Sequence, residues 1–175
     1  MKIIRKRFYH FLLSAITFIS FTAIAEAQDI KGTFAIKNIE TGVYIRIKDA
    51  NTSNGTPMVA YSPENWKCMT WDFEKIDSNI YRLKNLYSGK TMQPISSSAT
   101  NGTALEEQPI DIKKAFQQYE FIHVEKNVYL IKLKGSDLYV TVSDSKGAIN
   151  SPIILVKKND SKLQLWSLHE QKPEI

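Results

Sequence analysis

The chain has 175 residues, of which 43% are hydrophobic, 11% aromatic and 23% charged. This length and balance suit one domain with a packed core and exclude a chain that is disordered throughout. The single cysteine, Cys68, cannot form an internal disulfide, and the three histidines lie far apart in the sequence. Disulfide scaffolds and zinc fingers are therefore excluded, and we expect neither a metal site nor a cofactor.

The first 27 residues have the pattern of a secretory signal peptide. Four basic residues within the first seven precede an apolar run from Phe8 to Ala25, and Ala25 and Ala27 place small residues around Glu26. This pattern predicts cleavage after Ala27 and a secreted, periplasmic or extracellular protein. The alternative is an uncleaved anchor helix, because the run approaches the roughly 20 residues that span a bilayer. No later apolar run approaches that length, so we expect no membrane span once the leader is removed.

The formal charge of +5 depends largely on this leader. Residues 28–175 retain 19 basic and 17 acidic side chains, which leaves no strongly basic face. A nucleic-acid partner is therefore not expected.

Residues 28–175 contain an internal repeat with a period near 47. Four kinds of landmark recur in order: an aromatic residue, a turn residue, the residue that follows a polar triplet such as Asn-Gly-Thr, and a closing aromatic residue. The aromatic landmarks are Phe34, Tyr81 and Tyr129, and the turn residues are Gly42, Gly89 and Asp137. The residues after the triplets are Pro57, Ala104 and Pro152, and the closing aromatics are Trp71, Tyr119 and Trp166. These spacings predict one domain over residues 28–175, with repeats at about 32–77, 78–125 and 126–172.

Within each repeat the local pattern predicts strands. Short runs such as 44–47 and 138–142 are β-branched and aromatic, and turn residues follow every 8 to 12 positions. Four strands per repeat are therefore expected, with one helical turn at most in 111–121. A four-stranded unit cannot bury its apolar face alone, so the three units should close around a shared core, with the closing aromatics near its axis.

The tripled segments resemble a known family. TGVYIRI is followed by NGTPMVAY and MTW, SGKTMQP by NGTALEEQ and QQY, and SDLYVTV by NSPIILV and QLW. This order is similar to that of the ricin-B-type β-trefoil lectins and covers residues 32 to 170. The resemblance implies an all-β chain, a β-trefoil of three pseudo-symmetric four-stranded repeats, and a carbohydrate or glycoconjugate partner.

The resemblance also implies a sugar pocket in each repeat, built from an aspartate, a stacking aromatic and a glutamine or asparagine near the closing aromatic. Here the aspartate position holds Arg46, Gln93 and Thr141 in turn. The stacking position holds Tyr61, Gln108 and Val156, and the glutamine position holds Met69, Gln117 and Gln164. No repeat keeps the whole set.

Two candidate carbohydrate-binding sites follow from these substitutions. In the first repeat, Arg46 would anchor the ligand and Tyr61 would stack on it, which suits an acidic sugar. In the second repeat, Gln93, Gln108 and Gln117 form a weaker polar group. The open alternative is that Arg46 is a solvated strand residue and Tyr61 a packing residue. In the third repeat, Gln164 is expected to bond to the turn backbone.

We expect a secreted, non-catalytic carbohydrate-binding module. The alternative is a protein-interaction or inhibitor β-trefoil whose sugar pockets are vestigial, which the loss of all three aspartates favours. No catalytic residues are predicted, because the acids at 72, 74 and 77 lack a separately placed partner carboxylate and Cys68 lacks a nearby histidine. Glu106 and Glu107 are adjacent in a strand and should point to opposite faces.

Overall fold

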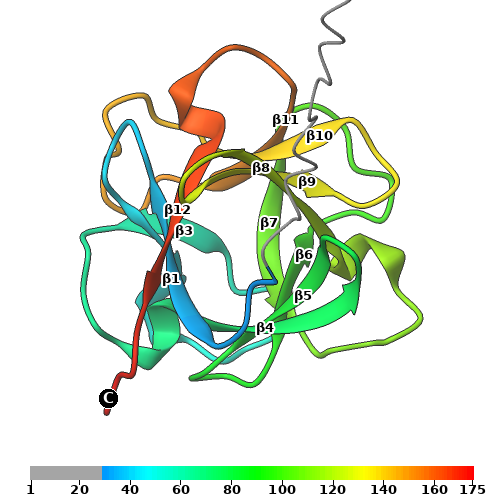
Figure 1. Ribbon diagram of the computed structural model, residues 1–175. Coiled ribbons are helices and arrows are strands. Elements are labelled where there is room, and N and C mark those ends of the chain that lie inside the picture. The colour runs from blue at the N-terminus through cyan, green and yellow to red at the C-terminus, as the bar shows by residue number, and fades with distance from the viewer. Residues whose placement is uncertain (1–28) are drawn as a thin grey trace, which may run out of the picture.

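A computed structural model describes residues 29–175, which form twelve strands (Figure 1). The predicted leader lies outside the described residues. The first four strands are β1 (Thr33–Asn38), β2 (Tyr44–Ile47), β3 (Met58–Tyr61) and β4 (Thr70–Asp77). The next four are β5 (Ile80–Asn85), β6 (Thr91–Pro94), β7 (Thr103–Gln108) and β8 (Tyr119–Glu125). The last four are β9 (Val128–Leu133), β10 (Leu138–Val142), β11 (Ile153–Lys157) and β12 (Leu165–Glu170).

The strands form three units that close on one another. In each unit the fourth strand pairs antiparallel with the first strand of its own unit and with the first strand of the next. The β4–β5, β8–β9 and β12–β1 pairings complete the ring. The remaining strands form the β2–β3, β6–β7 and β10–β11 hairpins. The predicted all-β architecture of three four-stranded repeats is therefore confirmed.

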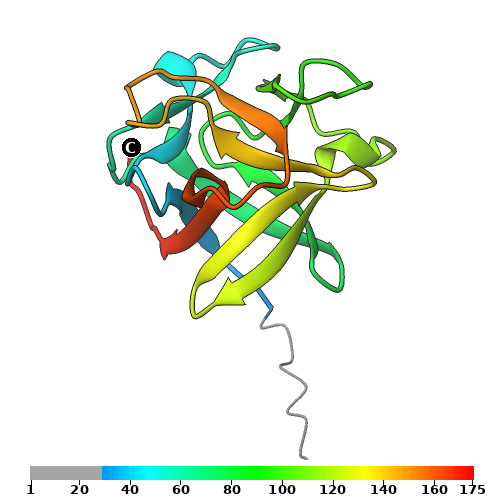
Figure 2. The ribbon, with the colours of Figure 1, turned by 90° about the horizontal axis from the view of Figure 1, so that it is seen from above.

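Figure 2 shows the two ends of this structure. The β8–β9 hairpin reaches toward the end where the described chain begins. The β2–β3 and β6–β7 connections lie at the opposite end. Closing the ring removes the unpaired edges of its six strands. No helix within residues 29–175 is both long and apolar enough to cross a bilayer.

The landmark aromatics meet in register inside the ring. The first and last aromatic of each repeat lie directly opposite each other on paired strands. The pairs are Phe34 with Trp71, Tyr81 with Tyr119, and Tyr129 with Trp166. The three closing aromatics are fully buried in one apolar cluster, as predicted. The 47-residue period thus places equivalent rings at equivalent points of one core.

The polar triplets link each repeat to the next. The backbone amide at the centre of each triplet donates to a carbonyl on the third strand of the following repeat. The bonds join Gly55 to Glu107 (2.9 Å), Gly102 to Leu155 (2.7 Å) and Asn150 to Ala60 (2.8 Å). The three donors have φ of 83°, 91° and 65°, a region that glycine adopts without a Cβ clash and that asparagine tolerates.

Two local features refine the sequence analysis. The turn of the third repeat is made by Gly135, at φ 75°, rather than by Asp137, because the chain turns back early through a bond from the Ser136 amide to the Leu133 carbonyl. The helical pattern in 111–121 is a single 3-10 turn, η3 (Ala115–Gln117), within the predicted limit. Equivalent turns, η2 (Lys67–Met69) and η4 (Lys162–Gln164), precede β4 and β12, and η1 (Lys48–Ala50) follows β2.

Candidate functional site

The side chain of Arg46 lies on the ring of Tyr61. Arg46 pairs with Val59 across β2 and β3, so Tyr61 is its diagonal neighbour on the same face. The guanidinium carbon is 4.1 Å from the Tyr61 ring centre and 5.8 Å from that of Trp66. Arg46 is only 8% exposed. The predicted pair is therefore in contact, and Arg46 is not a solvated strand residue.

This buried cation has no ion-pair partner in the part of the chain that the structure describes. None of the ion pairs within residues 29–175 includes Arg46, and its buried Nε atom has no hydrogen-bond partner. Burying an unpaired charge costs several kcal/mol, whereas a desolvated cation–π contact returns about 2 kcal/mol. Burial raises the pKa of the adjacent Cys68 thiol, although Arg46 opposes this shift, so the thiol supplies no negative charge at neutral pH. The Nε–H of Arg46 is therefore a buried donor without an acceptor within residues 29–175.

Arg46 is one of the residues that line a hollow of about 200 Å³, whose surface is almost entirely apolar. The other lining residues are Ala50, Trp66, Cys68, Tyr87 and Ile175. Arg46 is the only one of these side chains that is charged at neutral pH, and the other walls are mainly aromatic and aliphatic. Tyr87 comes from the β5–β6 turn, so the second repeat completes the hollow of the first. We call this space the Arg46 hollow.

The sequence pattern identified Arg46 but missed both aromatic residues that line the hollow. Tyr61 supports Arg46 and does not line the hollow, whereas Trp66 and Tyr87 do. Trp66 lies five residues before Trp71, where an extra aromatic was a usable signal. Tyr87 was not predictable from the first repeat, because the closed sheet brings it across from the second.

In the second repeat, the predicted polar group is bonded internally. Gln117 is fully buried, and its Nε2 donates to Gln93 Oε1 (2.9 Å) and to the Pro109 carbonyl (3.0 Å). Its Oε1 accepts from the Asp111 amide (2.8 Å). Gln108 donates to Glu106 Oε1 (2.9 Å). The structure thus joins Gln93 to Gln117 and directs the amide of Gln108 to a different partner.

In the third repeat, Gln164 has the backbone role that the sequence indicated. It is fully buried, and its Nε2 donates to the carbonyls of Lys157 (3.1 Å) and Val156 (3.4 Å) and to Thr141 Oγ1 (3.3 Å). Its Oε1 accepts from the Asn159 amide (3.0 Å). Gln164 therefore links β10 and β11 by hydrogen bonds.

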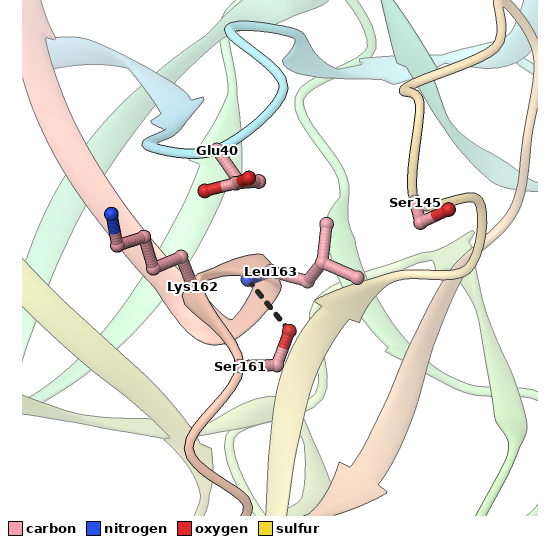
Figure 3. A pocket seen from close by; sticks show the side chains of 5 residues that line it. All are labelled: Glu40, Ser145, Ser161, Lys162 and Leu163. Carbon is pink, nitrogen blue, oxygen red and sulfur yellow. Dashed lines mark hydrogen bonds between the residues drawn. The ribbon is translucent and has the colours of Figure 1, made fainter.

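A second hollow, of about 290 Å³, occupies the equivalent place in the third repeat (Figure 3). It is lined by Glu40, Ser145, Ser161, Lys162 and Leu163. The repeat period relates Tyr87 to Glu40, Ala50 to Ser145, Trp66 to Ser161 and Cys68 to Leu163. In Figure 3 the Ser161 hydroxyl accepts from the Leu163 amide (3.2 Å). Equivalent positions thus form an aromatic, cationic hollow in one repeat and a polar one in the other.

Of the acidic residues considered from the sequence, Glu106 and Glu107 lie on opposite faces of one strand and Glu74 lies in an ion pair. Glu107 is 1% exposed and Glu106 is half-buried, on opposite faces of β7 as predicted. Glu74 pairs with Arg82 (3.6 Å). Within residues 29–175, no three His, Cys, Asp or Glu side chains are grouped to hold a metal ion.

The closed ring of three four-stranded units defines a β-trefoil. The chain is similar to the designed three-fold symmetric protein ThreeFoil, with a TM-score of 0.76 and 18% identity over 80% of this chain and 99% of that one. It is also similar to the Rhizoctonia solani agglutinin, with a TM-score of 0.73 and 18% identity over 82% and 98% of the two chains.

A third similar structure is the Macrolepiota procera ricin B-like lectin in complex with lactose, with a TM-score of 0.67 and 16% identity over 83% and 99% of the two chains. The family model for ricin-type beta-trefoil lectin domain-like proteins matches residues 20–108. The chain belongs to this family, and the predicted resemblance is confirmed. No curated protein sequence matches the chain.

Proposed function

We propose that this protein is a secreted, non-catalytic carbohydrate-binding module that binds an acidic saccharide in the Arg46 hollow. The observation that carries the proposal is Arg46, a buried cation with no ion-pair partner within residues 29–175, among the residues that line an otherwise apolar hollow. Family membership supports carbohydrate as the ligand class. The signal-peptide pattern of residues 1–27 supports export.

The chemistry of the hollow favours an anionic ligand over a neutral one. A neutral sugar presents hydroxyl groups that need both donors and acceptors, whereas Arg46 offers donors alone. A carboxylate accepts two parallel hydrogen bonds from a guanidinium, and this charge-assisted pair is about twice as strong as a neutral one. The C–H face of the same sugar ring suits the aromatic walls. A uronic acid or another carboxylated sugar combines both properties.

A glycan array tests this proposal, using the chain from Gln28 onward, which contains all twelve strands. We expect binding to carboxylated glycans and its loss in Arg46→Gln. A matched control is Lys162→Gln, which removes a cation from the equivalent hollow of the third repeat and should leave the array pattern unchanged. Equal binding by Arg46→Gln and the unaltered chain would refute the assignment of the site.

A protein partner is the second candidate function. No repeat keeps the aspartate of the family pocket, and the amides of Gln93 and Gln117 bond to each other instead of remaining free for a ligand. Under this alternative the array is blank and the exported chain co-purifies with a protein from its source. Such a result would replace the saccharide proposal.

A further inference from the structure

We propose that Trp66, together with Tyr87 of the next repeat, is the platform on which the saccharide lies, and that Tyr61 is a positioning residue that holds Arg46. This inference rests on the proposed function, because it assigns roles within the Arg46 hollow. It changes the role predicted for Tyr61 from the family pattern.

The face of Tyr61 that would receive a sugar is already covered. The Arg46 guanidinium is 4.1 Å from the ring centre, which is the distance of direct stacking. A sugar ring and a guanidinium cannot occupy that face together. Tyr61 is also absent from the lining of the hollow. Its ring is therefore placed to fix the direction of the guanidinium.

Trp66 has the exposure and the support that a platform needs. Trp66 lines the hollow and is partly exposed, and it packs against a buried cluster that includes Cys68 and Met69. The Trp66 carbonyl accepts hydrogen bonds from the Met69 amide (3.0 Å) and the Thr70 hydroxyl (2.9 Å). The Tyr61 ring lies 6.0 Å away at 39° and supports it from the side. Both backbone and ring are thus ordered before a ligand arrives, which lowers the entropic cost of binding.

Tyr87 supplies the second aromatic wall from a fixed turn. Its backbone amide donates to Asn85 Oδ1 (2.9 Å), and the residue is 49% exposed. In the equivalent hollow of the third repeat, Glu40 and Ser161 replace Tyr87 and Trp66. The aromatic pair therefore distinguishes the Arg46 hollow from its structural equivalent, as expected for residues that determine specificity.

Calorimetric titration with a β-glucuronide and the matching β-glucoside separates these roles, because the two ligands differ only in the carboxylate. Trp66→Ala should weaken glucuronide binding about tenfold or more and preserve the ratio of the two affinities. Tyr61→Ala should lower that ratio toward the value of Arg46→Gln. The double variant Arg46→Gln/Tyr61→Ala should bind no more weakly than Arg46→Gln alone.

Conservative variants guard against misfolding. Tyr61→Phe and Trp66→Phe keep a ring and should restore most of the affinity lost in the alanine variants. Ser161→Ala, at the position equivalent to Trp66, is the matched control and should bind normally. The inference is overturned if Trp66→Ala binds glucuronide normally, or if Tyr61→Ala weakens binding further in the Arg46→Gln background. If the unaltered chain binds neither ligand and no other carboxylated glycan, the proposed function itself fails.

Discussion

The backbone amide of Asn150 donates to the carbonyl of Ala60, joining the third repeat to the first at 2.8 Å. Gly55 and Gly102 make the equivalent bonds at the other two junctions. Asn150 is thus a non-glycine residue at φ 65° in a position where the other repeats use glycine. A single turn conformation is required at each point where one repeat meets the next.

The positive φ of Asn150 predicts that glycine is tolerated at this position and that a β-branched residue is not. Asn150→Gly should change the free energy of unfolding by less than about 0.5 kcal/mol, because glycine adopts positive φ freely. Asn150→Val should lower the free energy of unfolding by about 1–2 kcal/mol, because a β-branched side chain clashes in that region. Chemical denaturation of both variants measures the difference. Equal stability of the glycine and valine variants would contradict the account of the junction.

The buried Glu107 carboxyl should make the free energy of unfolding depend on pH. Both of its carboxylate oxygens are buried without a hydrogen-bond partner within residues 29–175, and the equivalent positions hold Ala60 and Leu155. Burial raises the pKa of the Glu107 carboxyl above its ordinary 4.5, more than the nearby Ser88 hydroxyl and Lys90 ammonium lower it. The folded state therefore favours the protonated form. The contribution of Glu107 to stability is complete below pH 4.5 and decreases as the pH rises through the raised pKa.

Glu107→Leu, which copies the third repeat, should accordingly raise the free energy of unfolding by about 1–3 kcal/mol at pH 7 and by less at pH 4. Thermal unfolding across this pH range measures the effect. The exposed Glu125→Gln is a control in which little change is expected. A stabilisation by Glu107→Leu that is the same at both pH values would show that charge at this position is not its cause.

Replacing each of the two core tryptophans by phenylalanine should lower the free energy of unfolding by a different amount. Trp166 Nε1 donates to the Val140 carbonyl (2.9 Å), whereas the buried Trp71 Nε1 has no hydrogen-bond partner within residues 29–175. Both Trp→Phe changes lose packing, but Trp166→Phe also loses a buried hydrogen bond. Trp166→Phe should therefore lower the free energy of unfolding by about 1 kcal/mol more than Trp71→Phe. The reverse order, in parallel denaturation curves, would refute this reasoning.

Substitution of Arg46 should reduce ligand affinity without reducing the stability of the fold. Arg46→Met keeps much of the side-chain volume and removes an unpaired buried charge, so the free energy of unfolding without ligand should stay equal or rise by about 1 kcal/mol. Affinity for a β-glucuronide should decrease at least tenfold, because a buried charge-assisted pair is lost. Thermal unfolding and calorimetry measure the two effects. A large loss of stability would indicate that Arg46 is a packing residue.

The sequence predicts this fold well because its repeat is visible in side chains that the fold uses directly. Trp71, Tyr119 and Trp166 are core residues, and the Asn-Gly-Thr triplets are turns that only a few residue types can form. The core aromatics and the turn triplets can both be recognised from the local sequence, and each recurs three times with the same spacing.

The site is less predictable from sequence, because its parts interact across strands and repeats. The family pattern directs attention to Arg46 and Tyr61, but it does not show that one covers the other. Tyr87 reaches the hollow from another repeat, and the Gln93–Gln117 bond spans 24 residues. Pairings of this kind follow from the register of the closed sheet, which sequence periodicity does not specify.

The most direct test of the account is the nuclear magnetic resonance signal of the Arg46 Nε–H group. Residues 28–175 contain two arginines, Arg46 and Arg82, so the side-chain spectrum has one signal to follow and one internal control. On adding a β-glucuronide, the Arg46 signal should move downfield and exchange more slowly with water, while the Arg82 signal stays in place. The matching β-glucoside should produce no such shift. A glucuronide that binds and leaves the Arg46 signal unchanged would contradict the central claim.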